Sequence, residues 1–207
     1  MLQRTDDWFN QRLGRFTASQ IHRLLGKEGL KRTNDSIDSF AFEKAVETLY
    51  GREEGTFISI DMQRGIDHEP LAFNIFKQYK ELDFLEVKEV GFYKFGKHAG
   101  ASPDGIVSNN CNLEIKCPRR NKFFKLVANG SQEIDKNYIA QMQMQMLCTG
   151  TDKTHFFNYY LENAIQYWHE IEVQRDEAMI DLIKSRIEVA SEIKLEYIEK
   201  INKNNQW

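Results

Sequence analysis

The sequence predicts an α/β or α+β fold in which a mixed central β-sheet is flanked by helices, and two observations predict it. Helical signals come first along the chain, and short β-type segments separated by Gly, Asn and Ser follow them. A further helix, two strands and a long closing helix complete an order that is typical of a sheet covered by helices. Since neither an internal repeat nor a domain boundary is visible, we expect residues 1–207 to form a single domain.

Two short helices are expected at the start of the chain. The first begins at Thr5-Asp-Asp7 and ends at Gly14, because acidic residues favour the first turn and glycine favours the position after the last. The segment Thr17-Ala-Ser-Gln20 is typical of a capping box and predicts a second helix, which Gly26 closes. A polar, basic loop is expected from Gly26 to Asp35.

Two longer helices follow. The third is expected from about Ser36 to Tyr50, and the fourth from about Asp61 to Tyr79, where Pro70 should bend it. The apolar side of the third helix comprises Phe40, Val46 and Leu49.

Six short segments rich in β-branched and aromatic residues are expected as strands. They are Phe84–Val87, Val90–Phe95, Ile106–Val107, Leu113–Cys117, Phe156–Leu161 and Tyr167–Val173. The segment Tyr138–Cys148 alternates in part like a strand, but its length and its good helix formers favour a helix. A long amphipathic helix is expected from about Asp176 to Asn202; its apolar face can pack on the core or contact another subunit, and we favour packing.

Composition is that of an ordinary globular protein and excludes several classes. Hydrophobic residues make up 41% and charged residues 29%, no apolar run approaches the length of a membrane span, and the N-terminus lacks the apolar core of a signal peptide. A cytoplasmic location is therefore expected. The three cysteines include no CxxC pair, which argues against a disulfide framework, a structural zinc site and a four-cysteine iron–sulfur cluster.

The net charge is −3, so any binding of nucleic-acid phosphates must come from local basic patches. Two basic clusters exist, one near the start of the chain and one in its middle. They comprise Arg12, Arg15, Arg23, Lys27, Lys31 and Arg32, and Lys116, Arg119, Arg120, Lys122 and Lys125. Taken alone, either cluster is more typical of a solvated face than of a DNA contact.

Two carboxylates are expected to meet in a β-hairpin. The segments Ser102–Val107 and Cys111–Lys116 are joined by the turn-forming residues Ser108-Asn-Asn110. A turn centred on the middle residue places Asp104 directly across from Glu114, with Cβ atoms about 4.5–5.5 Å apart. A bulge would shift this register, but the two carboxylates would stay close to each other.

These side chains fit metal-assisted cleavage of a phosphodiester. Strand alternation puts Lys116 on the face of Glu114, while Leu113 and Ile115 turn into the core. Two close carboxylates repel each other unless a cation lies between them or one is protonated, and they can hold one or two Mg²⁺ ions. A neighbouring lysine can position an attacking water, or take its proton if the pKa of the lysine is depressed. The alternative is a surface hairpin with a weak ion pair between Glu114 and Lys116.

Pro103-Asp104 followed by Glu114-Ile-Lys116 resembles the PD-(D/E)XK nuclease signature. The wider set of motifs, in order, is Trp8-Phe-Asn-Gln-Arg12-Leu-Gly14, Phe16-Thr-Ala-Ser19, Gly65 to Glu69, Ser102-Pro-Asp-Gly105, Leu113-Glu-Ile-Lys-Cys-Pro118 and Tyr138-Ile-Ala-Gln141. Together they are similar to the YqaJ-type viral recombinases, the family of the phage lambda exonuclease. The resemblance extends from Trp8 to at least Gln145, and the closing Asn-Gln-Trp207 is similar to the end of the lambda enzyme.

The resemblance implies a restriction-endonuclease-like core and the degradation of one strand of duplex DNA from its 5′ end, which leaves 3′ single-stranded tails for recombination. It implies Mg²⁺ as the cofactor, with two ions per active site and with Mn²⁺ able to substitute. It also implies a ring-shaped homotrimer on double-stranded DNA ends, a single-strand annealing protein as partner, and a phage or prophage protein in the cytoplasm of a bacterial host.

Roles can be carried over residue by residue from the same resemblance. The implied metal ligands are Asp104, Glu114 and Ile115, with Lys116 activating the water. Glu69 is implied as a helical carboxylate that supports the metal site, and Gln141 as a glutamine near the attacking water. On a helix, Tyr138, Gln141 and Gln145 share one face, which fits that role.

The 5′-terminal phosphate is implied to bind at Arg12 and Ser19, with Ser102 able to add its hydroxyl. A capped helix start at Thr17 and the guanidinium fork of Arg12 are both suited to an anion. Arg64 stands where some relatives have Trp, and it either contacts the DNA backbone or is solvated.

Two alternatives stay open on the sequence. One is an endonuclease or a RecB-type nuclease of the same superfamily, which the cysteine count and the pair Arg12 and Ser19 disfavour. The other is a non-catalytic module that binds DNA ends, which the complete set of Asp104, Glu114 and Lys116 disfavours.

Overall fold

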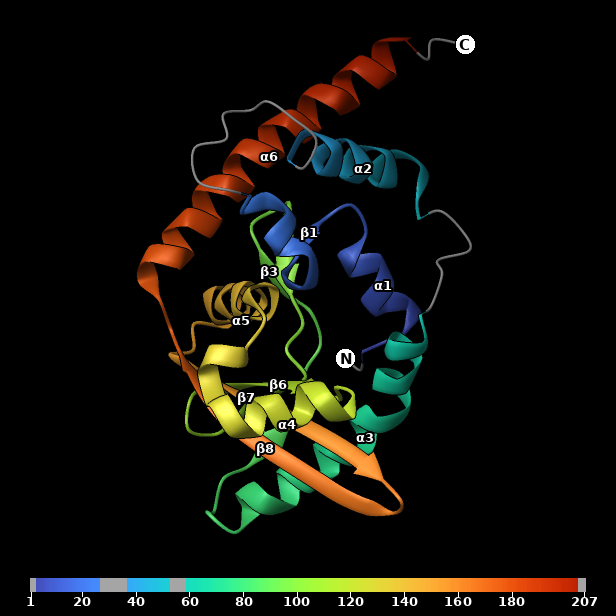
Figure 1. Cartoon of the computed structure of the whole chain (residues 1–207). Helices are drawn as coiled ribbons and strands as arrows, with labels where there is room; N and C mark the ends of the chain where they lie inside the picture. The colour runs from blue at the N-terminus through green and yellow to red at the C-terminus, as the bar shows by residue number, and fades with distance from the viewer. Residues whose placement is uncertain (1–2, 27–36, 53–58, 205–207) are drawn as a thin grey trace.

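The computed structural model describes residues 3–26, 37–52 and 59–204, and Figure 1 shows their arrangement. Three sequence predictions lie outside these residues. They are the start of the third helix at Ser36, the basic loop with Lys27, Lys31 and Arg32, and the closing Asn-Gln-Trp207.

The first helix, α1 (Asp6–Arg12), forms as predicted. The side-chain oxygen of Thr5 accepts a hydrogen bond from the Trp8 amide at 3.3 Å, so the helix has a conventional N-cap. Gly14 follows the helix with φ +64°, a conformation that favours glycine. An added Cβ there would lie 2.2 Å from the Thr48 hydroxyl, so glycine also permits close packing on the next helix.

The second predicted helix differs from expectation. It is a 3-10 helix, η1 (Ala18–Leu24), preceded by a short strand, β1 (Phe16–Thr17). The predicted capping box is wrong, because the Thr17 side chain caps no backbone N–H and its hydroxyl lies 3.4 Å from the Ser19 hydroxyl instead. Pairing of β1 with another strand holds Thr17 extended, and the helix ends at Leu24, before Gly26.

The two longer helices are α2 (Ile37–Tyr50) and α3 (Ile60–Glu81), and Pro70 lies inside α3. Phe40 is buried in α2 as predicted, whereas Val46 and Leu49 are only half-buried. The buried side of α2 comprises Phe40, Ala41, Lys44 and Ala45. The buried face therefore lies about one residue position around the helix from the predicted one. It was missed because it includes small alanines, which carry little hydrophobic signal.

The central sheet is five-stranded and mixed, in the order β2-β5-β6-β7-β8. Its strands are β2 (Val87–Lys88), β5 (Gly105–Val107), β6 (Cys111–Lys116), β7 (Lys153–Glu162) and β8 (Ile165–Gln174). Strands β6 and β7 are parallel and the other neighbours are antiparallel, which confirms the predicted fold class. Positive φ angles at Asn163 and Ala164 make the two-residue turn of the β7–β8 hairpin.

A second, three-stranded sheet has the order β1-β4-β3, with β3 (Tyr93–Phe95) and β4 (Ala99–Ala101). Strand β4 was not predicted, because Ala99-Gly-Ala101 lacks β-branched residues although all three are buried. The predicted strand from Phe84 is wrong over most of its length, because Phe84 has φ +60° and is 98% exposed. Only Val87 of that segment joins the sheet.

Helices cover both faces of the central sheet. Odd-numbered residues of β6 and β7, such as Leu113, Ile115 and Phe157, pack with Phe73 and Phe76 of α3. On the other face, Phe156 packs with α4 (Arg120–Asn129) and α5 (Lys136–Thr149), which η2 (Gly130–Glu133) connects. The helix predicted over Tyr138–Cys148 is therefore correct, whereas α4 was missed because basic residues surround its two buried ones.

The closing helix α6 (Glu177–Asn204) packs on the molecule, as favoured from the sequence. Its buried side meets α2, α5 and η1, and it lies beside α2 in Figure 1. The buried ammonium of Lys194 donates to the carbonyl of Gly14 at 2.6 Å, which ties α6 to the end of α1.

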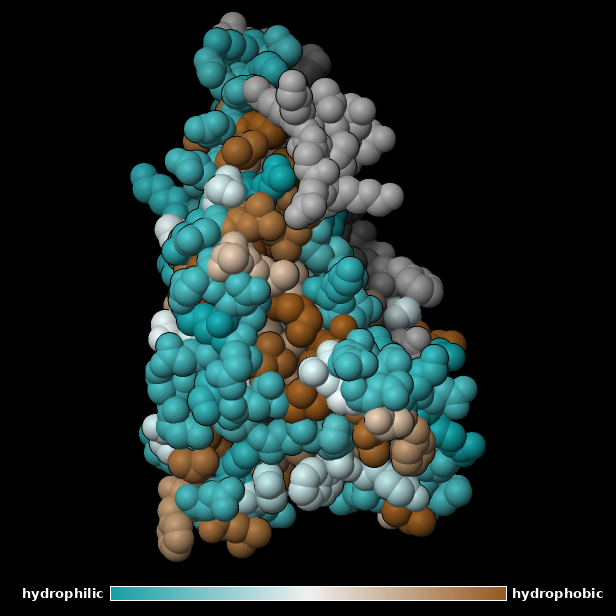
Figure 2. Space-filling model, turned by 60° about the vertical axis from the view of Figure 1, so that its left-hand side comes forward, coloured by the Kyte–Doolittle hydropathy of each residue, from teal (hydrophilic) through white to brown (hydrophobic). Residues whose placement is uncertain are grey.

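Figure 2 shows apolar side chains in a band between hydrophilic regions on one face. Of the helices in the described ranges, none has both the length and the apolar composition needed to cross a bilayer.

Candidate active site

The β5–β6 hairpin has the predicted register. Gly105 pairs with Leu113 and Val107 with Cys111, so the turn is centred on Asn109. Asp104 lies just beyond the paired residues, and its amide donates to the carbonyl of Leu113 at 2.9 Å. The Asp104 carboxylate accepts a hydrogen bond from the backbone amide of Ile115 at 2.7 Å. The ladder therefore ends at Asp104, and its carboxylate is fixed beside the backbone of β6.

Glu114 is 1% exposed, and three side chains hold its carboxylate. Lys116 donates to Oε1, together with Gln141 at 2.7 Å, while Gln145 donates to Oε2 at 2.6 Å. The two glutamines are one turn apart on α5, on the face predicted from the sequence. One lysine of β6 and two glutamines of α5 thus hold both oxygens of the buried Glu114 carboxylate in place.

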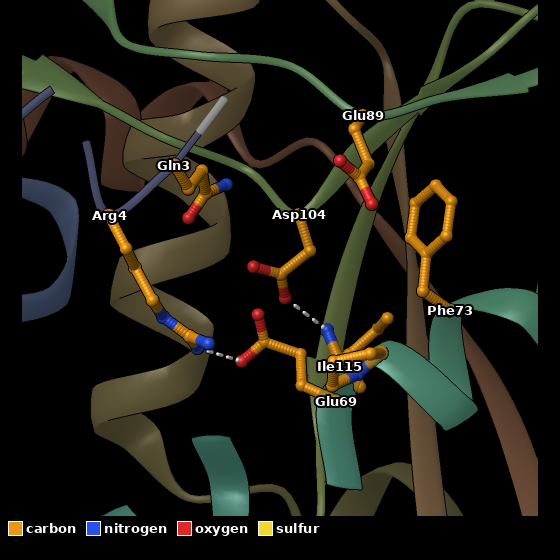
Figure 3. Close-up of a pocket in the computed structure, with 8 residues that line it drawn as sticks. Gln3, Arg4, Glu69, Phe73, Glu89, Asp104 and Ile115 are labelled. Carbon is orange, nitrogen blue, oxygen red and sulfur yellow. Dashed lines mark hydrogen bonds and ion pairs between the residues drawn. The ribbon is translucent and has the colours of Figure 1, made fainter. Parts of the chain in front are cut away.

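Glu69 and Asp104 line a cavity of about 260 Å³ that also exposes Ile115 and Glu89. Figure 3 shows the carboxylates of Glu69 and Asp104 pointing toward one another, with Glu69 from α3 and Asp104 from the β4–β5 connection. The guanidinium of Arg4 contacts Glu69 Oε2 at 2.8 Å. Glu69 is therefore at the site, as predicted, but it is paired with an arginine from the start of the chain.

Crowding of the three carboxylates changes the acidity of two of them. Burial raises the pKa of Asp104 well above its usual range, and the charges of Glu114 and Glu69 add to this effect. Burial also raises the pKa of Glu69, against the opposing charges of Arg4 and Lys116. The site therefore favours either protonation of these carboxylates or a cation bound beside them.

Lys116 is charged in this arrangement. Burial alone would lower its pKa, but the charges of Glu114 and Asp104 and the hydrogen bond to Glu114 outweigh burial and raise it. The Lys116 ammonium also lies 4.8 Å from the ring centroid of Tyr138, and Lys122 lies equally far from the same ring. Of the two roles considered for Lys116, the geometry favours a hydrogen-bond donor over a general base.

A second cluster surrounds the hydroxyl of Ser102. The indole N–H of Trp8 donates to Ser102 Oγ at 2.9 Å, and Arg12 approaches the same oxygen at 3.5 Å. Arg12 also lies 3.4 Å from Ser19 Oγ and 4.1 Å above the Trp8 ring. Burial, together with the nearby charge of Arg52, lowers the pKa of Arg12 to about 10, so it is still charged near neutral pH. The three residues predicted to bind a phosphate are therefore gathered into one cluster that carries a cation and two hydroxyls.

The two clusters are joined by the backbone. Ser102 and Asp104 are separated by one proline, so their Cα atoms are at most about 7 Å apart. Gln145 spans the same junction, because its amide donates to Glu114 and lies 3.5 Å from the carbonyl of Ser102. The hydroxyl cluster and the carboxylate site are thus linked through Ser102, Pro103 and Gln145.

The donor set suits a hard divalent cation. Carboxylate oxygens from Asp104 and Glu114 and the main-chain carbonyl of Ile115 are the kind of ligands that Mg²⁺ accepts. A cation there would offset the repulsion that raises the pKa of Asp104. Within residues 3–26, 37–52 and 59–204, no three Asp, Glu, His or Cys side chains already form a complete ligand set. The site would therefore need main-chain and solvent oxygens in addition to its carboxylates.

Two of the residues that the structure brings to the site, Arg4 and Trp8, had no predicted role. Arg4 precedes α1 and had no signal at all. Trp8 could have been found by spacing, because it lies four residues before Arg12 on the same helix. Arg64 donates to the carbonyl of Cys117 at 2.9 Å, so it is held against the strand end that carries Lys116.

Comparison with known proteins gives consistent results. The sequence profile of the YqaJ-like viral recombinase domain matches residues 7–152. The structure of LHK-Exo in complex with dAMP superposes with a TM-score of 0.81 at 29% identity, covering 97% of each chain. The alkaline exonuclease LHK-Exo from Laribacter hongkongensis gives 0.78 at 31% identity over the same share of each chain. A phage-related exonuclease from Haemophilus somnus 129PT shares the fold, with a TM-score of 0.73 at 17% identity, covering 95% of this chain and 99% of that one. No curated protein sequence is significantly similar to the chain.

Proposed function

The chain belongs to the YqaJ-like viral recombinase family, and from this premise we propose that it is a Mg²⁺-dependent exonuclease that degrades one strand of double-stranded DNA in the 5′→3′ direction. The product would be a duplex with a 3′ single-stranded tail, a substrate for recombination. Similarity to an alkaline exonuclease over nearly the whole chain supports the nuclease activity.

The observation that carries the proposal is the closeness in the chain of the carboxylate site to the cluster of Arg12, Ser19 and Ser102. A terminal phosphate held by this cluster would leave the next phosphodiester near Asp104 and Glu114. We therefore expect single nucleotides to be released from the phosphate-bearing 5′ end. The related LHK-Exo structure contains dAMP, which is consistent with a mononucleotide product.

Each residue of the carboxylate site has a distinct part in the proposed reaction. Asp104, Glu114 and the Ile115 carbonyl would hold Mg²⁺, which supplies Lewis-acid chemistry at the scissile phosphate when bound. Mn²⁺ is expected to substitute, and two ions per site are proposed from the resemblance. Glu69 would support the ions from α3.

The remaining groups would orient the reactants. Lys116, a charged donor, would position the attacking water against the phosphate. Gln141 donates to the Glu114 carboxylate, and we propose from the resemblance that it also contacts the same water. The amide of Ile115 holds the Asp104 carboxylate toward the cavity, so that both acidic residues are arranged before the substrate arrives.

The proposed partners follow from the substrate and from the family. Double-stranded DNA ends are the substrate, a homotrimer is proposed from the resemblance, and a single-strand annealing protein would receive the tail. We propose the bacterial cytoplasm, in a phage or prophage context, as the place where the protein acts.

The test is digestion of linear duplexes that carry a label at one end of each polarity. The proposal expects Mg²⁺-dependent release of labelled mononucleotide from the 5′ end first, and no digestion of covalently closed circles. Cutting of closed circles would identify an endonuclease instead. Tight end binding without any cleavage, unchanged in Glu114→Gln, would identify a non-catalytic module. The solution mass of the protein tests the trimer.

A further inference from the structure

Arg4 lies in the cavity of the proposed active site, although the proposed chemistry does not use it. Its guanidinium contacts Glu69 Oε2 at 2.8 Å, and the two side chains are 42% and 30% exposed. The same cavity is lined by Asp104 and Ile115, so Arg4 faces the space that a scissile phosphodiester would fill. Figure 3 shows its side chain reaching across the cavity to Glu69.

The backbone around Arg4 is held in an unusual conformation. Arg4 has φ +64°, in the left-handed region that a residue with a Cβ seldom adopts. Its neighbour Gln3 donates from its side-chain amide to the carbonyl of Pro103 at 2.7 Å, and Thr5 caps α1. The strained residue is thus fixed between the turn that carries Asp104 and the helix that carries Arg12. Strain of this kind is concentrated at functional sites.

The charges at the site show what Arg4 does in the free protein. Three carboxylates, Glu69, Asp104 and Glu114, face two cations, Lys116 and Arg4. Lys116 is bound to the buried Glu114, whereas Arg4 forms a half-exposed ion pair, a kind that is weak and easily exchanged. Arg4 would repel a divalent cation near Glu69, because both are positively charged. The two would also compete for the same carboxylate.

A DNA phosphate offers Arg4 another partner. Guanidinium groups bind phosphate oxygens through two parallel N–H donors, and the half-exposed group can turn toward the cavity. Resting on the proposed function, we propose that Arg4 exchanges Glu69 for a phosphate of the bound strand, so that DNA binding frees Glu69 to support the metal site. Arg4 is then a positioning residue that links metal loading to the presence of substrate.

Two measurements without any cleavage test this exchange. The first is the affinity for Mn²⁺ alone, by calorimetry in the absence of DNA. The second is the affinity for a 5′-phosphorylated blunt duplex in a chelating buffer, by fluorescence anisotropy. Arg4→Ala should bind Mn²⁺ about three- to tenfold more tightly, because one positive charge beside the ion has been removed. The same variant should bind the duplex about three- to tenfold more weakly, because one phosphate contact has been lost.

Matched variants separate the proposed exchange from a general charge effect. Lys184→Ala removes a cation from a similar half-exposed pair on α6, with Asp181 at 3.0 Å, and should change neither affinity. Arg4→Lys keeps the charge and should retain the wild-type Mn²⁺ affinity. Unchanged or weaker Mn²⁺ binding by Arg4→Ala, or unchanged duplex binding, overturns the exchange. Glu114→Gln should abolish Mn²⁺ binding in the same assay; if it does not, the proposed metal site fails, independently of Arg4.

Discussion

Asp104→Asn should stabilise the metal-free protein while abolishing cleavage. The Asp104 carboxylate is buried and repelled by Glu114 and Glu69, so its charge opposes folding when no cation is present. Asparagine keeps an oxygen that can accept from the Ile115 amide, which Asp104 now binds at 2.7 Å. Its NH₂ group can donate to the neighbouring carboxylates, so the substitution removes repulsion without leaving an unpaired buried group.

A single stabilising substitution commonly adds about 0.5–2 kcal/mol to the free energy of unfolding, and we expect Asp104→Asn to fall in this range. For a chain of 207 residues this corresponds to a rise in Tm of about 1–8 °C. Saturating Mg²⁺ should stabilise the wild-type protein by about 2.7 kcal/mol at one hundred times Kd, and should hardly affect the variant. The order of stability should therefore reverse when the metal is added.

The assay is thermal unfolding of both proteins, with EDTA and with Mg²⁺. A variant that is less stable than wild type in EDTA would refute the charge argument. A wild-type Tm that does not respond to Mg²⁺ would refute the assignment of the carboxylates as metal ligands.

Acid provides a second check on the same substitution. The pKa of Asp104 is higher in the folded chain than in the unfolded chain, so the folded state binds more protons between the two values. The destabilising contribution of Asp104 is thus full at higher pH and is relieved as the pH falls through the raised pKa. The advantage of Asp104→Asn in EDTA should shrink in acid; an advantage that grew instead would contradict the sign.

Three further predictions concern single residues. Lys116→Ala should lower the single-turnover cleavage rate by about 10²–10³-fold with duplex binding retained, because one positioned donor is lost. Lys122→Ala removes a cation from the same Tyr138 ring and should change the rate little. Arg12→Ala should reduce the preference for a 5′-phosphorylated over a 5′-hydroxyl end by about 10–100-fold in a competition assay. Arg23 pairs with Glu43 instead, so Arg23→Ala should leave this preference unchanged. Burial lowers the pKa of Lys194 from 10.5 to about 8, so the folded state binds fewer protons than the unfolded state between these two pH values. The free energy of unfolding should therefore rise with pH across this range by up to about 3 kcal/mol. Urea unfolding should show this rise for the wild type and not for Lys194→Met; parallel pH profiles would contradict it.

The hairpin at the centre of the site was predictable because its parts are local. Two turn-forming asparagines set the register of β5 and β6, and strand alternation then fixed the side on which Glu114 and Lys116 lie. Gln141 and Gln145 were placed correctly on one face because helical spacing alone decides that question.

What the sequence could not supply depends on tertiary contacts. Thr17 carries a capping signal, but pairing of β1 with β4 draws it into a strand and leaves a 3-10 helix behind it. Strand β4 consists of Ala99-Gly-Ala101, whose packing partners alone make it a strand. Arg4 reaches Glu69 over sixty-five positions of sequence, a contact that no local pattern encodes.

The bond from Lys194 to Gly14 sets an order on the making of this protein. Gly14 ends the helix that carries Trp8 and Arg12, and its partner is 180 positions later in the chain. A ribosome adds about 5–20 residues per second, so on the order of ten to forty seconds pass between their synthesis. Through that interval the helix that carries Trp8 and Arg12 lacks its hydrogen bond to α6, although β6 and the two glutamines of α5 have already been synthesised.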